Sequence, residues 1–177
     1  SRKLKYTHGY GLVLLPVHEF LPQGKPNLLI KNIPPEESLE SIRLERPEIY
    51  YGEKTNDHVY VQTTEKEFDY PSGNENVYSE YDGTGGVEIG PLIRRIGYAW
   101  KFDDYRLFFS SYFTPESRVL FRRNILQRIS TLVPFLIYDR DPYAVITSEG
   151  RIQFIIDAYT VSDKYPYSEK YGGTLGT

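Results

Sequence analysis

The hydrophobic positions of this 177-residue chain change their spacing about halfway along it. In the first half they gather in short runs interrupted by prolines and glycines, a pattern typical of β-strands joined by turns. We expect a short helix to start in the proline- and acid-rich segment 34–38. The Gly-, Asn- and acid-rich segment 72–90 is expected to be one long loop. The expected strands are residues 10–17, 27–33, 49–52, 59–63 and 67–70.

In the second half the apolar residues recur every three or four positions, which is the period of an α-helix. Pro91 is expected to start a first helix, and Asp103 with Asp104 to cap a second, short one. Thr114 predicts the start of a longer third helix, which Pro134 should end or kink. The apolar stripe of the first helix is Leu92, Ile96, Ala99 and Trp100. The stripe of the third is Phe121, Ile125, Ile129, Leu132 and Leu136.

The last part of the chain is expected to be a β-hairpin. Residues 143–148 and 151–160 flank Glu149-Gly150, a plausible two-residue turn. Together these elements predict an α+β fold for a single domain of residues 1–177. Its sheet would be mixed or mainly antiparallel, with about three helices packed on one side. We expect residues 171–177 to form a disordered tail.

Composition excludes several classes of function. A net charge of -3 argues against a nucleic-acid surface, which needs a basic excess. The chain has no cysteine, so thiol nucleophiles, disulfides and cysteine-ligated zinc are excluded. No apolar run is long enough to cross a bilayer. Because the chain has no methionine and begins Ser1-Arg2-Lys3, we expect it to be a fragment of a longer protein.

The charged residues that most suggest a site lie on the expected third helix and on the hairpin. Arg118 and Arg122 fall on nearly the same helical bearing as the apolar stripe, in the first turns, where the macrodipole disfavours positive charge. They therefore need carboxylate partners or an anionic ligand, and we expect Asp139, Asp141 and Asp157 as the partners. The favoured interpretation is an ion-pair network that locks helix to hairpin. An anion or substrate site is the alternative.

His8 is the histidine best placed to bind a ligand or act as a base, since glycines follow it at positions 9 and 11. A satisfied, partly buried histidine is the more common outcome. Three histidines without close spacing do not predict zinc, and Asp139 with Asp141 offers too few oxygens for calcium. The glycines of residues 83–86 lack the lysine of a phosphate loop, so a flexible loop is expected there rather than an anion-binding nest. No metal, cofactor or catalytic residue is predicted.

A series of motifs occurs in order along nearly the whole chain. They are Tyr6-Thr7-His8-Gly9-Tyr10-Gly11, Arg46-Pro47-Glu48-Ile49-Tyr50-Tyr51-Gly52-Glu53, Glu67-Phe68-Asp69-Tyr70-Pro71, Gly83-Thr84-Gly85-Gly86, Thr114-Pro115-Glu116-Ser117-Arg118, Arg123-Asn124-Ile125, Asp141-Pro142-Tyr143, Ile156-Asp157-Ala158-Tyr159-Thr160 and Tyr165-Pro166-Tyr167-Ser168. In these motifs the chain resembles uncharacterised protein family 0182 of bacterial membrane proteins. The resemblance implies a multi-span membrane region followed by a large extracytoplasmic portion, of which this chain would be a piece at the cell membrane. It implies no activity.

Three functions are compatible with these observations. The favoured one is a non-enzymatic binding or structural module outside the membrane, because 17 tyrosines and a long loop suit contact surfaces. Its partners would be the rest of its own membrane-spanning chain and an envelope component or protein. The second is a hydrolase acting on an envelope polymer through carboxylates such as Asp139, Asp141 or Asp157. The third is a ligand-sensing or transport-accessory domain in which Arg118 and Arg122 hold an anion.

Overall fold

A computed structural model describes residues 2–39 and 41–162 of the chain. Its helices are α1 (Arg2–Lys5), α2 (Leu92–Phe102), α3 (Arg106–Phe109) and α4 (Ile125–Leu132). Its strands are β1 (Gly9–Tyr10), β2 (Ile30–Lys31), β3 (Glu36–Glu37), β4 (Glu48–Ile49), β5 (Val59–Val61), β6 (Glu67–Ser72), β7 (Glu75–Ser79), β8 (Val87–Glu88), β9 (Arg118–Leu120), β10 (Ile137–Tyr138), β11 (Tyr143–Ile146), β12 (Ile152–Ile155) and β13 (Ala158–Tyr159). The α+β class is confirmed, with four helices in these residues where about three were expected.

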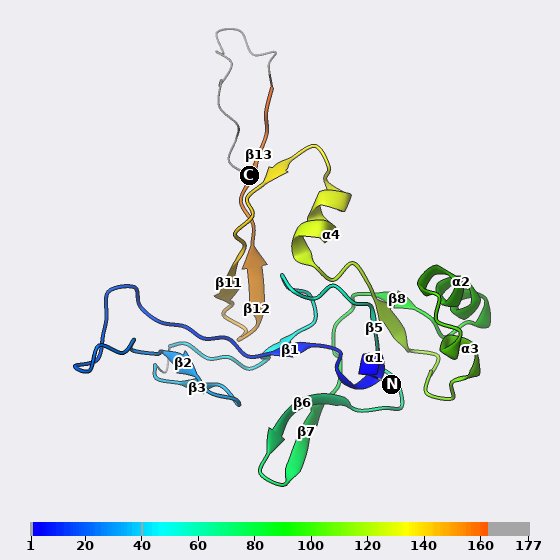
Figure 1. Cartoon of the computed structure of the whole chain (residues 1–177), viewed down its shortest axis with the longest axis horizontal. Helices are drawn as coiled ribbons and strands as arrows, with labels where there is room; N and C mark the ends of the chain where they lie inside the picture. The colour runs from blue at the N-terminus through cyan, green and yellow to red at the C-terminus, as the bar shows by residue number, and fades with distance from the viewer. Residues whose placement is uncertain (1, 40, 163–177) are drawn as a thin grey trace.

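The strands pair in antiparallel fashion, as expected, but they form six small sheets rather than one. The largest is the three-stranded sheet β5-β9-β8, which lies at the centre of the fold (Figure 1). Side chains alternate between the faces of a strand, so Tyr60 and Val119 face one side of this sheet while Val59 and Leu120 face the other. The first side packs on Leu4, Ile89, Ala99 and Leu107, and the second on Tyr50, Tyr51 and Tyr81.

The prediction of a helix that begins at Thr114 is wrong for the first ten residues of that helix. Residues Arg118–Leu120 form β9, because Val119 and Leu120 are fully buried when they pair with β5. Thr114 belongs instead to a turn in which its backbone N–H donates to Ser117 Oγ at 2.8 Å. The helix begins only at Ile125, where Asn124 Oδ1 accepts a hydrogen bond from the Gln127 N–H at 3.0 Å. Strand pairing within the core therefore overrides the helical period of the sequence.

Other local expectations also differ from the structure. Segment 34–38 contains strand β3 rather than a helix start, and the Ile33–Pro34 peptide bond is cis. The expected long loop at 72–90 contains β7 and β8, because Gly73, at φ +61°, turns the chain back into a hairpin with β6. The hairpin of β11 and β12 is confirmed, with Gly150 in its turn at φ +69°. The tail expected at 171–177 lies outside the described residues, and a single domain over 1–177 stays a prediction.

Helix α2 begins directly after Pro91, as expected, but it turns a different face to the core. Of the predicted stripe, only Ala99 is buried, while Leu92, Ile96 and Trp100 are exposed. The residues that pack inward are Tyr98, Ala99 and Phe102. Asp103 ends α2 in a left-handed conformation instead of capping α3. Asp104 Oδ1 does accept a hydrogen bond from the Arg106 N–H at the start of α3, at 3.3 Å.

Several elements project from the central sheet (Figure 1). The arm with β2 and β3 extends to one side, and α4 with the β11–β12 hairpin extends to another. None of the residues of α4, β11 or β12 is buried. Helices α2 and α3 form the end of the molecule opposite the arm. Within residues 2–39 and 41–162, no helix has the length and apolarity needed to cross a membrane.

Candidate functional site

The polar side chains best suited to proton transfer or ion binding form one group beside the central sheet, which we call the buried polar cluster. It is centred on Glu67, the first residue of β6, which is 3% exposed. The Glu67 carboxylate accepts hydrogen bonds from the Thr7 hydroxyl, the Tyr50 hydroxyl (2.8 Å) and the Tyr81 backbone N–H (3.3 Å). Burial and the neighbouring Glu67 carboxylate raise the pKa of Tyr50, so this phenol stays protonated and keeps donating. The members of the cluster are Thr7, His8, Tyr50, Glu67, Asp69 and Arg123.

His8 lies in this cluster with its side chain fully buried. Its Nε2 is 2.9 Å from Asp69 Oδ1, and its Nδ1 is 2.9 Å from the Thr7 hydroxyl. Asp69 also accepts a hydrogen bond from Ser79 Oγ at 2.6 Å, which ties the β6–β7 hairpin to the N-terminal segment. Both ring nitrogens of His8 therefore lie within hydrogen-bond distance of a partner. The sequence analysis favoured such a hydrogen-bonded histidine over a solvent-accessible catalytic base.

Arg123 is the cation of the cluster and is 4% exposed. Its Nε donates to the Tyr50 carbonyl at 2.7 Å, one terminal nitrogen donates to the Asp57 carbonyl at 3.1 Å, and the other donates to the Thr7 carbonyl. Burial lowers the pKa of Arg123. The five donors of a guanidinium let one side chain join three segments that are far apart in sequence. Arg123 thus connects the segment before α4 to the N-terminal segment, to the residue that follows β4 and to the 54–57 turn.

The row Thr7–His8–Asp69 has the order of a nucleophile, a base and an orienting acid. Two features argue against that use. The Thr7 hydroxyl already donates to Glu67, and Thr7 has no exposed surface at which a substrate atom would meet it. A buried network whose members satisfy one another instead makes the local structure rigid and specific. These hydrogen bonds tie the N-terminal segment to β6.

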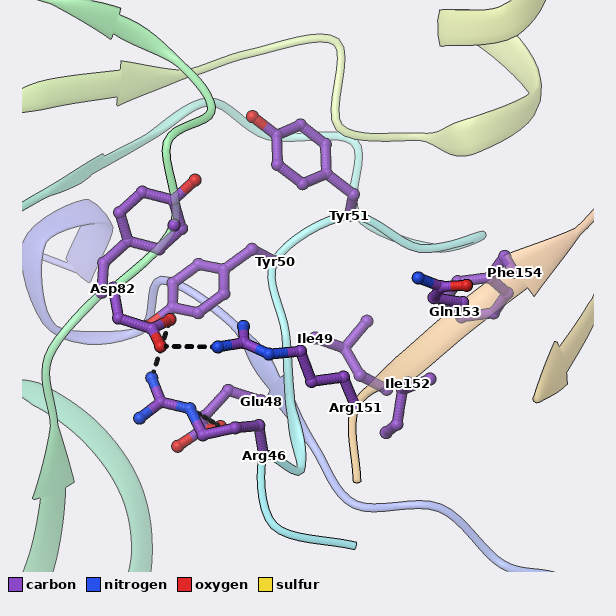
Figure 2. A pocket seen from close by; sticks show the side chains of 12 residues that line it. Arg46, Glu48, Ile49, Tyr50, Tyr51, Asp82, Arg151, Ile152, Gln153 and Phe154 are labelled. Carbon is purple, nitrogen blue, oxygen red and sulfur yellow. Dashed lines mark hydrogen bonds and ion pairs between the residues drawn. The ribbon is translucent and has the colours of Figure 1, made fainter. Parts of the chain in front are cut away.

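An open pocket of about 260 Å³ lies beside the cluster and shares Tyr50 with it (Figure 2). Arg46 and Arg151 both point at Asp82 there, with N···O distances of 2.9 and 3.2 Å (Figure 2). Glu48 Oε2 lies 3.5 Å from Arg46 Nε and accepts no hydrogen bond from any described residue. Most of the rest of the wall is aromatic or apolar, formed by Ile49, Tyr51, Tyr81, Ile152 and Phe154, and Gln153 adds a polar side chain. Charged groups and ring faces thus meet in one hollow.

The predicted contact between the arginines and the acidic corner is wrong. Arg118 lies on β9, where its Nη1 donates to the carbonyls of Thr84, Gly85 and Gly86 and its Nη2 pairs with Glu88 at 2.8 Å. Arg122 is exposed, at φ +49°. The physical reason is that β9 is a strand, so the helical bearings that placed both arginines over the hairpin do not apply. Anion binding by either residue stays a prediction.

The acidic corner is joined by hydrogen bonds among its own residues, and no arginine within the described part of the chain pairs with it. Asp139 Oδ1 accepts a hydrogen bond from the Asp141 N–H at 3.0 Å, and the Asp139 N–H donates to the Asp157 carbonyl at 2.9 Å. All three aspartates are exposed. No group of three or more His, Asp or Glu residues in the described ranges is placed to hold a metal ion. These carboxylates are not arranged as an opposed pair across the pocket of Figure 2, which they do not line.

The glycine segment 83–86 is held by hydrogen bonds from Arg118. Its carbonyls, not its N–H groups, point at Arg118, which is the opposite of an anion-binding nest. Gly86 has φ +81°, and a Cβ there would overlap the side chain of the fully buried Leu120 and lie 2.9 Å from the Val119 carbonyl. A side chain at position 86 is therefore excluded by both backbone conformation and space.

We expect Gly86→Ala to lower the free energy of unfolding by about 2–4 kcal/mol, from left-handed strain and overpacking. Gly97→Ala should change the free energy of unfolding in the opposite direction, because position 97 lies within α2 and has open space around it. That change should raise the free energy of unfolding by up to about 1 kcal/mol, the helix-propensity difference. Urea denaturation of both variants checks the pair, and equal effects would contradict the packing of this loop.

A pH-dependent contact lies on the other side of the central sheet, at His58. Its Nε2 is 2.8 Å from Lys3 Nζ, and its ring stacks on Phe102 with centroids 4.0 Å apart. Burial and the Lys3 charge lower the pKa of His58 from 6.5 to about 4. The folded state therefore resists a proton that the unfolded chain takes up below about pH 6.5. Stability from this group is complete above pH 6.5 and is lost as the pH falls toward 4.

His58→Phe should remove this pH dependence while keeping a ring to stack on Phe102. We expect the Tm of the wild type to fall more than the Tm of His58→Phe when the pH is lowered from 7 to 4.5. Thermal unfolding of both chains across this range is the measurement. A difference that is the same at both pH values would show that His58 does not titrate as described.

Sequence reasoning did not find Glu67, Tyr50 or Arg123 as a connected group. Each lies within one of the motifs on which the family resemblance rests, but no spacing in the sequence joins them. The only available signal was their presence in those motifs.

The comparisons with known proteins agree with the resemblance. The model of a family described as "Uncharacterised protein family (UPF0182)" matches residues 1–176. A UPF0182 protein of Sulfurovum sp. (strain NBC37-1) is 51% identical over 169 residues, which cover 96% of this chain and 18% of the relative. Relatives from Desulforamulus reducens and Methanospirillum hungatei are each 48% identical, over 97% and 96% of this chain. These alignments cover 18% and 19% of those two relatives.

The chain thus spans about a fifth of the length of the curated relatives it matches. No solved structure matches it. Since the family model covers nearly every residue and relatives share about half of their aligned positions with it, this chain belongs to the UPF0182 family.

Proposed function

We propose that this chain is a non-enzymatic binding and structural module in the outer portion of a longer membrane-spanning protein. Its first partner is the rest of its own chain, against which its projecting elements pack. The observation that carries the proposal is the apolar surface that these elements leave open. Val17 on the N-terminal arm is 92% exposed, and Phe135, after α4, is 77% exposed.

Helix α4 shows why a covering partner is needed. It has only eight residues, and helices this short are not stable in water without tertiary packing. Within the described residues it is held by Asn124, by Tyr138, and by Arg128, whose guanidinium lies 4.8 Å from the centre of the Tyr51 ring. Its Leu132 stays largely exposed. A short helix with an exposed leucine and few tertiary contacts is typical of a surface that another segment covers.

The curated relatives are long enough to contain such a covering segment. About four-fifths of each curated relative lies beyond the part that this chain matches. The buried polar cluster supports a non-enzymatic role, because its proton-transferring groups are satisfied by one another and Thr7 is closed to solvent. It makes the centre rigid, and the periphery is then free to dock.

Cysteine labelling in the longer protein tests this proposal, since the 177 residues contain no cysteine. Any cysteine elsewhere in the longer protein would be replaced first. A single cysteine would then be placed at exposed Asn74, between β6 and β7, or at Leu132 on α4. We expect a membrane-impermeant maleimide to label Asn74→Cys in intact cells and Leu132→Cys much more slowly.

The two cysteine variants test different parts of the proposal. Labelling of Asn74→Cys only after cell lysis would contradict the location outside the membrane. Labelling of Leu132→Cys as fast as Asn74→Cys would contradict the covering of α4 by the rest of the chain.

The pocket of Figure 2 favours a second candidate, the binding of a polyhydroxylated segment of an envelope polymer. Ring faces suit the apolar faces of sugars. The Gln153 side chain, which lines the pocket, suits hydroxyl groups. Soluble glycan fragments should then raise the Tm of the wild type and not that of Gln153→Ala. A glycan-induced shift of the same size in both chains, or in neither, counts against this candidate.

A further inference from the structure

We propose that the exposed face of α2, together with α3, docks on the surface of an anionic phospholipid bilayer. This inference rests on the proposed location of the chain beside the membrane, and it assigns a lipid surface, rather than a protein, to one face of the molecule. Four apolar side chains of α2 form that face, which we call the α2 outer face: Leu92, Ile93, Ile96 and Trp100.

The α2 outer face is continuous. At about 100° per residue, its four side chains fall within an arc of about 100°. All four are exposed, and Ile93 and Trp100 are 74% and 88% exposed. A continuous apolar arc of this size on the surface of a protein marks a site of protein or membrane contact.

A different face of the same helix already packs on the core. Tyr98, Ala99 and Phe102 belong to the cluster formed with the central sheet, and Arg95 donates to the Ile89 and Phe113 carbonyls. The helix therefore has one apolar face for the fold and a second that no described residue covers. This second face contains Leu92, Ile96 and Trp100 of the predicted stripe, whereas Ala99 of that stripe is buried in the core.

Helix α3 and the turn before it extend the apolar surface. Tyr105 is 67% exposed and Phe109 is 87% exposed. In Figure 1, α2 and α3 lie together at one extremity of the molecule, away from the arm with β2 and β3 and from the β11–β12 hairpin. A surface at an extremity can meet a flat bilayer without obstruction from the other elements.

The charges around this surface favour anionic lipid as its occupant. Helix α2 carries Arg94, Arg95 and Lys101 and no acidic residue. Arg94 pairs with Glu88 at 3.7 Å and Arg95 is turned toward the fold. Lys101 and, on α3, Arg106 are exposed and have no carboxylate partner among the described residues. Of the two acids that follow α2, Asp104 is close to Tyr60 on the inner side, and only Asp103 is exposed. The whole chain, by contrast, has a net charge of -3. Basic residues beside a Trp- and Ile-containing apolar face are the composition of helices that lie in the membrane interface.

The other exposed apolar segment lacks this composition. Residues 11–23, which include Val17 and Phe20, contain neither Lys nor Arg. Such a surface suits packing against protein, because nothing in it attracts a phosphate headgroup. The two surfaces therefore have different partners: the rest of the chain for the arm, and lipid for the α2 outer face.

Trp100 makes the proposal directly measurable, because it is the only tryptophan of the 177-residue chain. We expect its fluorescence to shift to shorter wavelength on addition of vesicles that contain phosphatidylglycerol, and to be quenched by brominated acyl chains. Vesicles of phosphatidylcholine alone should give at least tenfold weaker binding. Ile93→Asp should abolish the shift, whereas Val17→Asp, which places the same charge on the arm, should not.

The longer protein gives an independent measurement that does not depend on folding of the chain by itself. Reconstituted in nanodiscs with doxyl-labelled lipid, a fluorophore on Ile93→Cys should be quenched, and one on Val17→Cys should not. A fluorophore at position 93 that is shielded from both water and lipid would overturn the proposal in favour of a protein partner. A Trp100 shift that appears with protein concentration and without lipid would overturn it in favour of a second copy.

These outcomes are separable from those of the proposed function. If the α2 outer face bound lipid but Asn74→Cys were labelled only after lysis, the lipid inference would stand and the proposed location outside the membrane would be refuted. Correct labelling from outside without quenching at position 93 would refute only the lipid inference.

Discussion

Replacing Arg123 with alanine is expected to lower the free energy of unfolding by about 3–5 kcal/mol, a large share of the stability of a domain this size. The change removes the donors for the carbonyls of Thr7, Tyr50 and Asp57. Buried carbonyls without partners each lose the full benefit of solvation, and the cavity left by the side chain adds to the cost. Urea denaturation followed by circular dichroism measures the effect.

Arg122 provides a matched control one residue away. It is exposed, and no hydrogen bond or ion pair joins it to another described residue. Arg122→Ala should therefore change the free energy of unfolding by less than about 0.5 kcal/mol. Arg123→Lys should fall between wild type and Arg123→Ala, since an ammonium cannot reach three separate carbonyls. If both alanine variants were equally stable, Arg123 would not hold the three segments together.

Glu67→Ala is expected to have the second largest effect, a loss of about 3 kcal/mol. It would leave the hydroxyls of Thr7 and Tyr50 and the N–H of Tyr81 without their acceptor. Glu67→Gln keeps the shape and one acceptor oxygen, so we expect it to lose about half as much. The same denaturation measurement ranks the variants.

The control for Glu67 is Glu75, which is exposed near the turn of the β6–β7 hairpin. Glu75→Ala removes the same charge from the same hairpin and should alter stability by less than about 0.5 kcal/mol. A loss at Glu75 comparable to that at Glu67 would mean that net charge, rather than the buried hydrogen bonds, determines the effect.

The parts of this fold that could be predicted are those with local causes. The β11–β12 hairpin follows from alternation around Glu149-Gly150, and the start of α2 follows from Pro91. Strand β9 was missed because its cause is not local: Val119 is buried only by pairing with β5 and β8. Its neighbours in sequence carry a helical period, and tertiary pairing overrides such a preference.

The buried polar cluster could not be predicted for a related reason. The bond between Thr7 and Glu67 joins residues 60 positions apart, and the bond between Arg123 and Thr7 joins residues 116 positions apart. Hydrogen bonds over such separations leave no periodic signal. His8 was singled out from the glycines that follow it as a candidate ligand-binding residue, but its partners Asp69 and Thr7 could not be identified. Arg118 and Arg122 were chosen on helical bearings that a strand does not have.

The α2 stripe illustrates a further limit of pattern reasoning. An apolar period predicts a helix with one apolar face, and it does not say whether that face meets the core or something outside the chain. In α2 the more regular stripe, ending at Trp100, points outward, and Ala99 with Phe102 faces the core. Only the structure separates these two faces.

The central claim is that a rigid, internally satisfied centre presents docking elements to the rest of a longer chain. Hydrogen–deuterium exchange, compared between the 177-residue chain and the longer protein, tests it most directly. The account predicts strong protection of β5 and β9 in both, and protection of α4 at least a hundredfold greater in the longer protein. Equal exchange of α4 in the two would contradict the claim.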